Sequence, residues 1–397
     1  MPSKSSVLFL EIGNFEIIIS AGKIDINDHF ELSYKEKINT NAIIKSEIFN
    51  YNEVSKILKK NLFLIEEKLD ITFKEIILIL NDIQSSSLNL TGYKKLNGSQ
   101  LSKENVTYII NTLKSKINTF ELNKHILHIF NVNFFLDQKK IKNLPIGLFG
   151  DFYSHELSVF LMDQNKYKNI KNMIDGCNLR VKKVFLKSFI QCANIDNNEN
   201  CDTFFKIEID KEGSNVTFFE NSALKFSQNF NFGSNLIIND ISKITSLEKD
   251  TIKNIIFNDN LEDTYKSSEF LEEKYFAKIN YRKIKKKLLY EIAAARIQEL
   301  SEIILTTNIN TYTLLKKSVP IFLKINDTNI HRNFKKCCKY FFSKSDSYQI
   351  TFIDNQPYEK LLDDTNKIAH FGWKSEAVPI ISTKKSIIAR FFDLLFN

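Results

Sequence analysis

The chain has 397 residues, of which 43% are hydrophobic, and this excludes both a single small domain and a chain that is disordered by composition. Its net charge of +8 fits contact with an anionic surface, either lipid or an acidic peptide, whereas no zinc-ligand spacing, aromatic RNP-like strand or Gly-rich basic tail supports nucleic acid. The five cysteines are odd in number and lack CxxC spacing, which argues against a disulfide framework or a metal site and favours a reducing cytosol.

The opening 84 residues have the pattern of strands followed by a helix and a further strand. Val7–Ile12, Phe15–Ala21 and His29–Lys35 alternate apolar and polar positions around turn residues, which predicts successive strands. Apolar residues recur at helical spacing over 52–69. The continuous apolar run Glu75–Leu80 predicts a fully buried strand.

The pattern changes at Ser85, and residues 85–163 are predicted to form an inserted small α/β subdomain. Leu144–Gly150 contains Pro and two Gly and is therefore expected to be a loop. The other elements expected here are strands Ser85–Leu90, His125–Val132, Asn133–Leu136 and Glu156–Met162, and helix Lys103–Ser115.

Strands and helices alternate over the rest of the chain. Gly176 suits a left-handed cap for a helix over Lys166–Asp175, and residues 354–383 are predicted to be loop and linker. The remaining predicted elements are strands Val181–Phe185 and Cys201–Ile209, the hairpin Ser214–Glu220 and Ala223–Phe230, helices Asn235–Ile244, Leu247–Ile256, Tyr281–Thr306 and Asn329–Phe342, and strands Val319–Ile325 and Gln349–Ile353.

The strand–turn–strand pattern at the start of the chain recurs in character near Phe204–Phe230. Two such halves around a cleft would form a duplicated ribonuclease-H-like α/β fold, which is the actin-like architecture. We therefore predict a first lobe from residues 1–84 and 164–200 and a second lobe from residues 201–353.

Several stretches, in order over most of residues 5–310, resemble the bacterial FtsA family of the actin-like superfamily. Asn143–Gly150 followed by Glu156–Val159 is similar to the stretch that closes the family's inserted subdomain. Phe232–Asn235 is similar to a Gly-containing turn of the family, and Tyr281–Ile304, with its Ala295-Arg296-Ile297, is similar to its long helix.

The resemblance implies that ATP binds in two strand–turn–strand loops, Leu10–Asn14 and Glu208–Ser214. In such loops Gly lets backbone N–H groups approach phosphate, and a carboxylate at each strand end handles the metal or its water. An ordinary hairpin with an acidic turn residue has the same local pattern. The residues implicated in nucleotide binding are Glu11, Gly13, Asn14, Glu208, Gly213, Ser214 and Gly233.

Departures from the family pattern weaken the case for ATP. Glu11 stands where the family has Asp, and Asp210, Lys211 and Glu212 fill Gly places in the second loop. Side chains and added carboxylates there would crowd and repel phosphate. No Gly occurs over Phe322–Thr328, where the family has an adenosine-site Gly pair. We expect weak or no ATP hydrolysis and leave ATP binding open.

A basic turn begins the long predicted helix. The resemblance implies that Arg282, Lys286 and Arg296 meet the acidic C-terminal tail of the filament protein FtsZ, and that the chain self-associates. A solvated helix face would show the same charge run.

The last segment, residues 384–397, is predicted to be an amphipathic membrane-targeting helix that lies in the bilayer interface, because it is too short to span. A terminal helix docked on the protein's own core is the alternative. The residues expected to meet lipid are Lys384, Lys385, Ile387, Ile388, Phe391, Phe392 and Leu395.

The sequence as a whole favours a peripheral adaptor rather than an enzyme. We expect it to anchor FtsZ filaments to the cytoplasmic face of the inner membrane at the division site and to help recruit later divisome proteins. Two alternatives share the superfold: a PilM-like pilus-assembly adaptor, which normally lacks the amphipathic tip, and a sugar or acetate kinase, which needs an intact Gly-rich phosphate loop.

Overall fold

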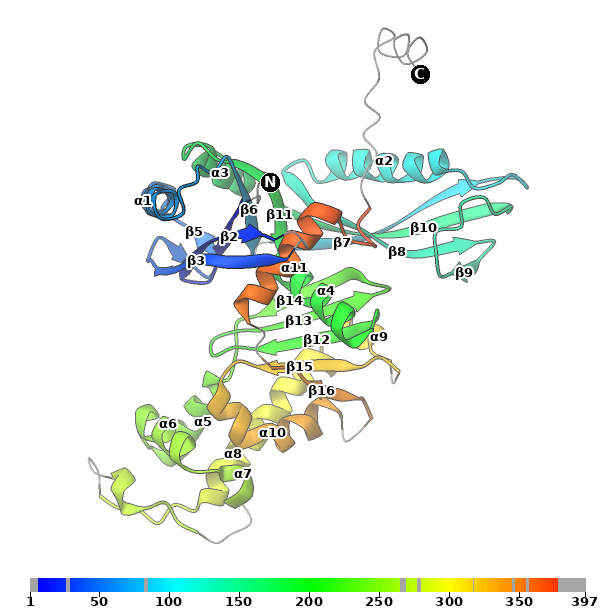
Figure 1. Cartoon of the computed structure of the whole chain (residues 1–397). Coiled ribbons are helices and arrows are strands. Elements are labelled where there is room, and N and C mark those ends of the chain that lie inside the picture. The colour runs from blue at the N-terminus through cyan, green and yellow to red at the C-terminus, as the bar shows by residue number, and fades with distance from the viewer. Residues whose placement is uncertain are drawn as a thin grey trace. The chain divides into compact units, whose positions relative to one another are not determined.

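The computed structural model describes residues 6–25, 29–81, 85–264, 269–276, 280–316, 318–344, 347–354 and 357–377 (Figure 1). The chain divides into two compact units. Unit 1 is Met1–Gln84 with Ile170–Phe371, and unit 2 is Ser85–Asn169 with Gly372–Asn397.

Unit 1 contains two five-stranded sheets, and the first has the strand order β11-β6-β1-β2-β3. In it β1 pairs antiparallel with β2 and parallel with β6. Both β1 and β6 are buried along almost their whole length, as their continuous apolar sequences require. The strands are β1 (Ser6–Ile12), β2 (Glu16–Ile24), β3 (Phe30–Asn39), β6 (Glu75–Leu80) and β11 (Arg180–Leu186).

The second sheet of unit 1 repeats this topology, with the order β14-β13-β12-β15-β16. Here β12 pairs antiparallel with β13 and parallel with β15, as β1 does with β2 and β6. The repeat confirms the predicted duplicated ribonuclease-H-like fold. The strands are β12 (Phe204–Ile209), β13 (Ser214–Glu220), β14 (Ala223–Phe230), β15 (Ile321–Ile325) and β16 (Ile350–Phe352).

Helices alternate with the strands of unit 1 along the chain and cover its sheets. Asn50 caps the first of them, since its side chain accepts a hydrogen bond from the backbone N–H of Glu53. The helices, together with a two-stranded hairpin, are α1 (Tyr51–Leu69), α3 (Gln164–Asp175), α4 (Lys187–Glu199), α5 (Asn235–Thr245), α6 (Lys249–Asn258), α7 (Leu261–Thr264), α8 (Lys286–Ser301), α9 (Ile309–Leu314), α10 (Thr328–Phe342), α11 (Tyr358–Phe371), the short helices Glu273–Phe276 and Glu302–Thr306, and β4 (Ile43–Ile44) with β5 (Glu47–Ile48).

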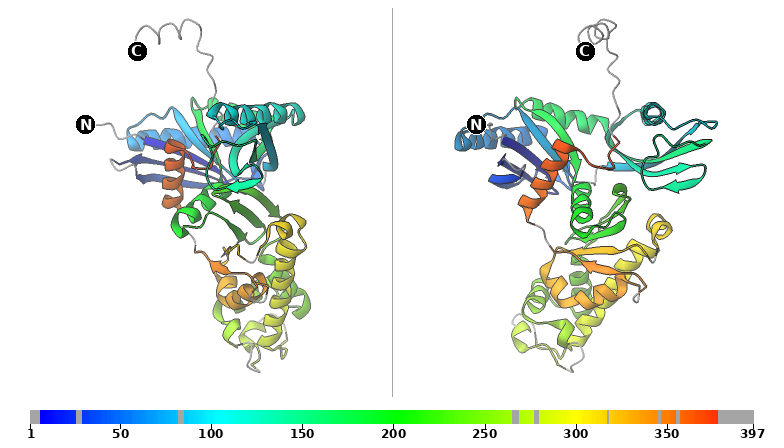
Figure 2. Two further views of the ribbon diagram at one scale, coloured as in Figure 1. Left: turned by 90° about the vertical axis from the view of Figure 1, so that its right-hand side faces the viewer. Right: turned by 45° about the vertical axis from the view of Figure 1, so that its right-hand side comes forward.

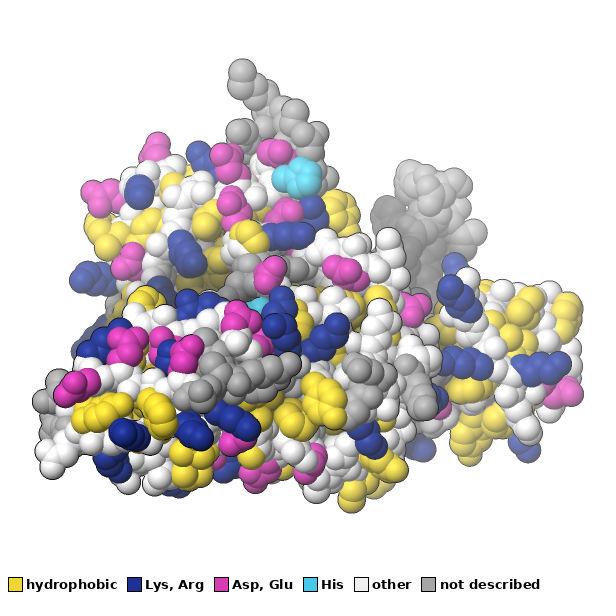
Figure 3. All heavy atoms as spheres, turned by 90° about the horizontal axis from the view of Figure 1, so that it is seen from below, with side chains coloured by type: hydrophobic (Ala, Val, Ile, Leu, Met, Phe, Trp, Pro, Cys, Tyr) yellow, Lys and Arg dark blue, Asp and Glu magenta, His cyan; other side chains and the backbone are white. Residues whose placement is uncertain are grey.

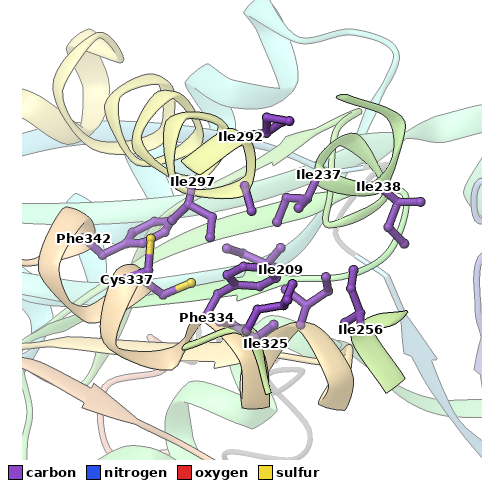
Figure 4. Close-up of a cluster of buried hydrophobic side chains, with 14 of the residues drawn as sticks. Ile209, Ile237, Ile238, Ile256, Ile292, Ile297, Ile325, Phe334, Cys337 and Phe342 are labelled. Carbon is purple, nitrogen blue, oxygen red and sulfur yellow. The ribbon is translucent and has the colours of Figure 1, made fainter. Parts of the chain in front are cut away.

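The core behind the second sheet brings strands and helices together (Figure 4). Ile209 and Ile325 from the strands face Ile297 of α8 and Phe334 and Cys337 of α10. Each large apolar side chain contributes about 1.5–3 kcal/mol when it leaves water, so this core fixes the sheet against its helices.

Unit 2 is a four-stranded sheet of order β7-β10-β8-β9, with α2 along one face (Figure 2). Its elements are β7 (Ser85–Lys95), α2 (Lys103–Phe120), β8 (Lys124–Leu136), β9 (Lys139–Ile141) and β10 (Phe152–Asp163). The segment 375–377 adds to β8: Asn131 N–H donates to the Ser375 carbonyl and Ala377 N–H to the Ile129 carbonyl, at 2.7 and 2.8 Å.

The predicted helix Tyr281–Thr306 is shorter in the structure. α8 begins at Lys286, because the preceding residues run extended and Lys285 forms a β-bridge with Phe270. Its last turn, Glu302–Thr306, is a π-helix. The two strands predicted over 125–136 are one strand, β8, which shifts register against β10 at two places instead of ending.

Among the helices that were not predicted, α4 and α11 are the longest. α4 follows β11 directly, and its sequence has a weak apolar stripe. α11 lies within the predicted linker 354–383, which is therefore wrong over that range. Phe30 and Leu32 of β3 donate backbone N–H groups to Asp363 and Glu359 of α11, at 2.8 and 2.9 Å. Tertiary contacts with the first sheet thus stabilise a helix whose own pattern looked like a linker.

Candidate functional site

Two glutamates occupy matching positions at the ends of β1 and β12. Glu11 and Glu208 are each the last residue but one of their strand, before the turns at 13–15 and 210–213. Both turns are closed by one backbone hydrogen bond, from Gly13 N–H to the Glu16 carbonyl (2.9 Å) and from Asp210 N–H to the Gly213 carbonyl (2.8 Å). These are the two loops that the sequence singled out.

Glu11 is buried and is paired with a lysine. Glu11 is only 2% exposed, and its Oε1 accepts a hydrogen bond of 2.6 Å from Lys187 Nζ. Lys187 opens α4. Burial alone would lower the pKa of Lys187, but Glu11 first, and then Glu208 and Asp210, raise it above its ordinary value. Lys187 therefore stays charged.

Tyr358 of α11 is close enough to Glu11 to feel its charge. Burial, followed by the charge of Glu11, raises the pKa of the Tyr358 hydroxyl above its ordinary value. Glu11 Oε2 is buried without a hydrogen-bond partner among the described residues. At the first loop, therefore, one carboxylate oxygen of Glu11 binds Lys187, and the other has no hydrogen-bond partner among the described residues.

Glu208 is held by three donors from its own sheet and the segment after it. Lys206 Nζ donates to Oε2 at 2.6 Å, and Lys324 Nζ and Asn326 Nδ2 donate to Oε1 at 2.9 and 2.8 Å. Burial raises the pKa of Glu208, but the two lysines outweigh burial and hold it well below its ordinary range. Lys206 Nζ also donates to Gln191 Oε1 of α4, at 2.6 Å.

Asp210, in the second turn, accepts a hydrogen bond from Asn326 Nδ2. Its pKa is raised, first by burial and then by the neighbouring charge of Glu208. We call the set that these contacts join the carboxylate–lysine cluster; it consists of Glu11, Lys187, Lys206, Glu208, Asp210, Lys324 and Asn326.

The second loop packs on the start of α5. A Cβ on Gly233 would lie 2.2 Å from the Asp210 carbonyl oxygen and 2.7 Å from that of Lys211, so only Gly fits there. Ser234 N–H and Asn235 N–H donate to these same two carbonyls, at 2.9 and 3.0 Å. The helix N-terminus, which could otherwise receive phosphate, is already occupied by the loop.

The other predicted nucleotide residues make local contacts. Asn14 Oδ1 accepts hydrogen bonds from Ser46 Oγ at 2.8 Å and from Asn81 Nδ2 at 3.2 Å. Ser214 Oγ donates to the Phe232 carbonyl at 2.7 Å. A Cβ on Gly213 would meet only the Phe230 carbonyl oxygen, at 3.3 Å.

These residues do not fit a nucleotide with its metal. The backbone N–H donors at the start of α5 are used, Glu208 accepts three hydrogen bonds, and Glu11 binds a lysine. Within the described part of the chain, no group of three or more His, Cys, Asp or Glu side chains could hold a metal ion.

The predicted partner-binding cations make contacts within unit 1. Arg282 Nη2 donates to the Thr245 carbonyl at 2.7 Å. Lys286 is buried, with Nζ 3.5 Å from Asp259 and 3.2 Å from Glu269. Arg296 binds Asp240 and Glu299. Their binding to FtsZ stays a prediction, and the buried Lys286 is poorly placed for it.

The other lysines of the predicted basic turn, and two apolar residues that the prediction did not include, lie around these cations. Lys283, Lys285 and Lys287 are exposed, as are Tyr281 and Leu288, at 42% and 39%. Figure 3 shows Lys and Arg, hydrophobic, and also Asp and Glu side chains interspersed over the end of unit 1 that carries α6–α8. The predicted membrane residues, from Lys384 to Leu395, lie outside the described residues.

Sequence reasoning missed the lysines of the cluster. One signal was available: Lys206 interrupts the apolar strand Phe204–Ile209 two residues before Glu208, so both side chains lie on one face. Lys187 gave no such signal, because its partner Glu11 is far away in sequence.

The curated proteins that the chain resembles in sequence carry the name FtsA. The chain is 24% identical over 252 residues to the "Cell division protein FtsA" of Buchnera aphidicola subsp. Acyrthosiphon pisum (strain APS), which covers 63% of this chain and 59% of the relative. It is 24% identical over 356 residues to the protein of that name from subsp. Baizongia pistaciae (strain Bp), covering 86% and 82%. The chain thus spans about three fifths of the first of these relatives. No protein-family model matches.

A solved structure shows the same fold. The chain matches the "PilM-PilN type IV pilus biogenesis complex" with a TM-score of 0.53 at 9% identity, over 93% of this chain and 98% of that one. At this identity the likeness concerns the fold alone. Together with the duplicated sheets, it shows that the chain has the actin-like fold, and in sequence the chain is similar to curated FtsA cell-division proteins.

Proposed function

We propose that this protein, whose relatives act in cell division, is an adaptor that ties FtsZ filaments to the cytoplasmic face of the inner membrane at the division site. In this proposal it binds the acidic FtsZ tail through unit 1, associates with further copies of itself, meets lipid through its C-terminal tip and helps recruit later divisome proteins. It is not proposed to be an enzyme, because its phosphate loops do not fit a nucleotide.

The observation that carries the proposal is the mixed surface at the start of α8. Exposed Lys283, Lys285 and Lys287 lie beside exposed Tyr281 and Leu288. A basic surface with apolar side chains suits an acidic peptide that also carries hydrophobic residues, because charge steers the encounter and apolar contact retains the peptide.

Reversing exposed charges tests this surface without disturbing the core. Lys283→Glu with Lys285→Glu should weaken binding of an FtsZ C-terminal peptide about 10-fold or more, and most at low salt, where screening is weak. Lys59→Glu with Lys60→Glu on α1 is the matched control, since these two lysines are also exposed and adjacent. If both variants bound the peptide equally well, this surface would not be its binding site.

The C-terminal tip supports the membrane contact through its sequence alone. In a helical arrangement Ile387, Ile388, Phe391 and Phe392 would share one side, and Lys384 and Lys385 precede them. The tip follows the segment 375–377, which is paired to β8 of unit 2.

Flotation with anionic liposomes tests the anchor. The full chain should float, and Phe391→Asp with Phe392→Asp should remain at the bottom of the gradient with an unchanged melting temperature. Persistent flotation of the double variant would rule out the tip as the anchor. A collapsed melting temperature would instead favour a tip docked on the protein's own core.

The alternatives are less well supported. The likeness to PilM concerns the fold alone, and the amphipathic tip favours the membrane adaptor over a pilus adaptor. A sugar or acetate kinase would need a phosphate loop with free backbone N–H groups, whereas those at the start of α5 are bonded to the loop carbonyls.

A further inference from the structure

Helix α4 contacts both strands, β1 and β12, that lead into the acidic turns of unit 1. Its first residue, Lys187, binds Glu11 of the first sheet, and Gln191, one turn later, binds Lys206 of the second. Residues four apart lie on one face of a helix, so α4 presents both side chains along one line. Two strands that are far apart in sequence are thereby connected through one helix.

The charges in the carboxylate–lysine cluster balance. Its carboxylates are Glu11, Glu208 and Asp210, and its ammonium groups are Lys187, Lys206 and Lys324. A buried carboxylate is costly unless a cation and further hydrogen bonds compensate it. In a nucleotide-binding actin-like site a metal ion serves that purpose, together with the phosphates that it carries.

We propose that Lys187 supplies from within the chain the positive charge that a nucleotide-bound metal would bring to the two acidic turns. The first and second sheets of unit 1 are then connected through α4 without nucleotide, and the protein keeps one arrangement of these turns whether ATP is present or absent. The fold otherwise permits the arrangement of these turns to change with bound nucleotide. Here the permanent ion pair between Lys187 and Glu11 replaces that change.

Thermal unfolding of the full chain tests the first part of the proposal. Addition of millimolar MgATP or MgADP should leave the melting temperature unchanged, because a ligand that binds only the folded state would raise it. A concentration-dependent rise with MgATP would overturn the proposal.

Variants test whether the charge of Lys187 is what matters. Lys187→Met should lower the melting temperature, while the control Lys182→Met, an exposed lysine of β11, should not. In a Glu11→Gln background the effect of Lys187→Met should shrink, since residues in one network are not additive. Strict additivity would overturn the proposal.

Lys187→Arg separates charge from packing, and it remains informative if Lys187→Met does not fold. Arg keeps the positive charge and hydrogen-bond donors at that position. It should fold with a melting temperature near that of the wild type. If Lys187→Arg is as damaged as Lys187→Met, packing around α4 explains the role of Lys187 and the proposal fails.

Discussion

The two sheets of unit 1 place a glutamate at the same point of the same topology and satisfy it differently. In the first sheet Glu11 lies opposite Ile18 of β2 and Ile79 of β6, which offer it no charge. In the second, Glu208 lies opposite Asn215 of β13 and Lys324 of β15. The first carboxylate therefore takes its cation from α4, and the second takes its cations from its own sheet.

This difference has a consequence for stability. Lys206 is only 2% exposed, whereas the side chain of Lys187 is 33% exposed and can turn toward water if its partner is lost. The second sheet should therefore tolerate the loss of its carboxylate less well than the first, because Lys206 would stay buried without that partner.

The largest effect should follow the loss of Lys206. Lys206→Met leaves Glu208 partly unpaired and removes the bond to Gln191, and it should lower the free energy of unfolding by about 3 kcal/mol in urea denaturation. Lys211→Met, at an exposed position of the adjacent turn, should change it by less than about 0.5 kcal/mol. A loss for Lys206→Met no larger than that of the control would show that the pair contributes little.

Glu208→Gln should cost about 2 kcal/mol at neutral pH, because it weakens the charged hydrogen bonds from both lysines. The lysines hold the pKa of Glu208 well below its ordinary value, so its contribution is present above the ordinary pKa and is lost as pH falls through the folded-state pKa. Unfolding measured from pH 7 down to pH 3 should show the gap between wild type and variant closing. A gap that is constant with pH would contradict the assigned ion pairs.

Replacement of a glycine at each of the two turns should also have different effects on stability. Gly233→Ala should cost about 2 kcal/mol, because its Cβ would meet the backbone oxygens of Asp210 and Lys211. Gly13→Ala should cost less than about 1 kcal/mol, because the nearest atom to its Cβ, at 2.7 Å, belongs to the flexible Glu16 side chain. Melting curves of the two variants, compared under one condition, decide this; equal losses would mean that both turns are equally close-packed.

The smallest difference concerns the asparagines that follow the parallel strands. Asn326→Ala removes donors to Glu208 and Asp210 and should cost about 1.5 kcal/mol. Asn81→Ala removes only bonds between neutral groups, to Asn14 and Ser46, and should cost about 0.5 kcal/mol. Chemical denaturation measures both losses. A larger loss of stability for Asn81→Ala than for Asn326→Ala would show that the first loop depends more on its amide contacts than on its ion pair.

Much of the fold followed from local pattern. The strand Glu75–Leu80 and the hairpin of β13 and β14 have the predicted boundaries, because continuous apolar runs and an Asn-Ser turn are signals that neighbouring residues carry themselves. The helix α11 was not predicted, because its stability depends on β3, more than 300 positions earlier in the sequence. Arg282 and Lys286 were assigned to a partner because a charge run does not reveal which of its members are paired within the chain.

The sequence alone determined the duplicated strand–turn–strand motifs, the acidic residue in each, and the loss of glycines from the second loop, since strand period and turn chemistry are local properties. Only the tertiary structure decided what those acids do. Lys187 meets Glu11 because β11 and β1 flank β6 in the same sheet and α4 begins where β11 ends. An ion pair between residues 176 positions apart is a property of the folded chain, which no local pattern specifies.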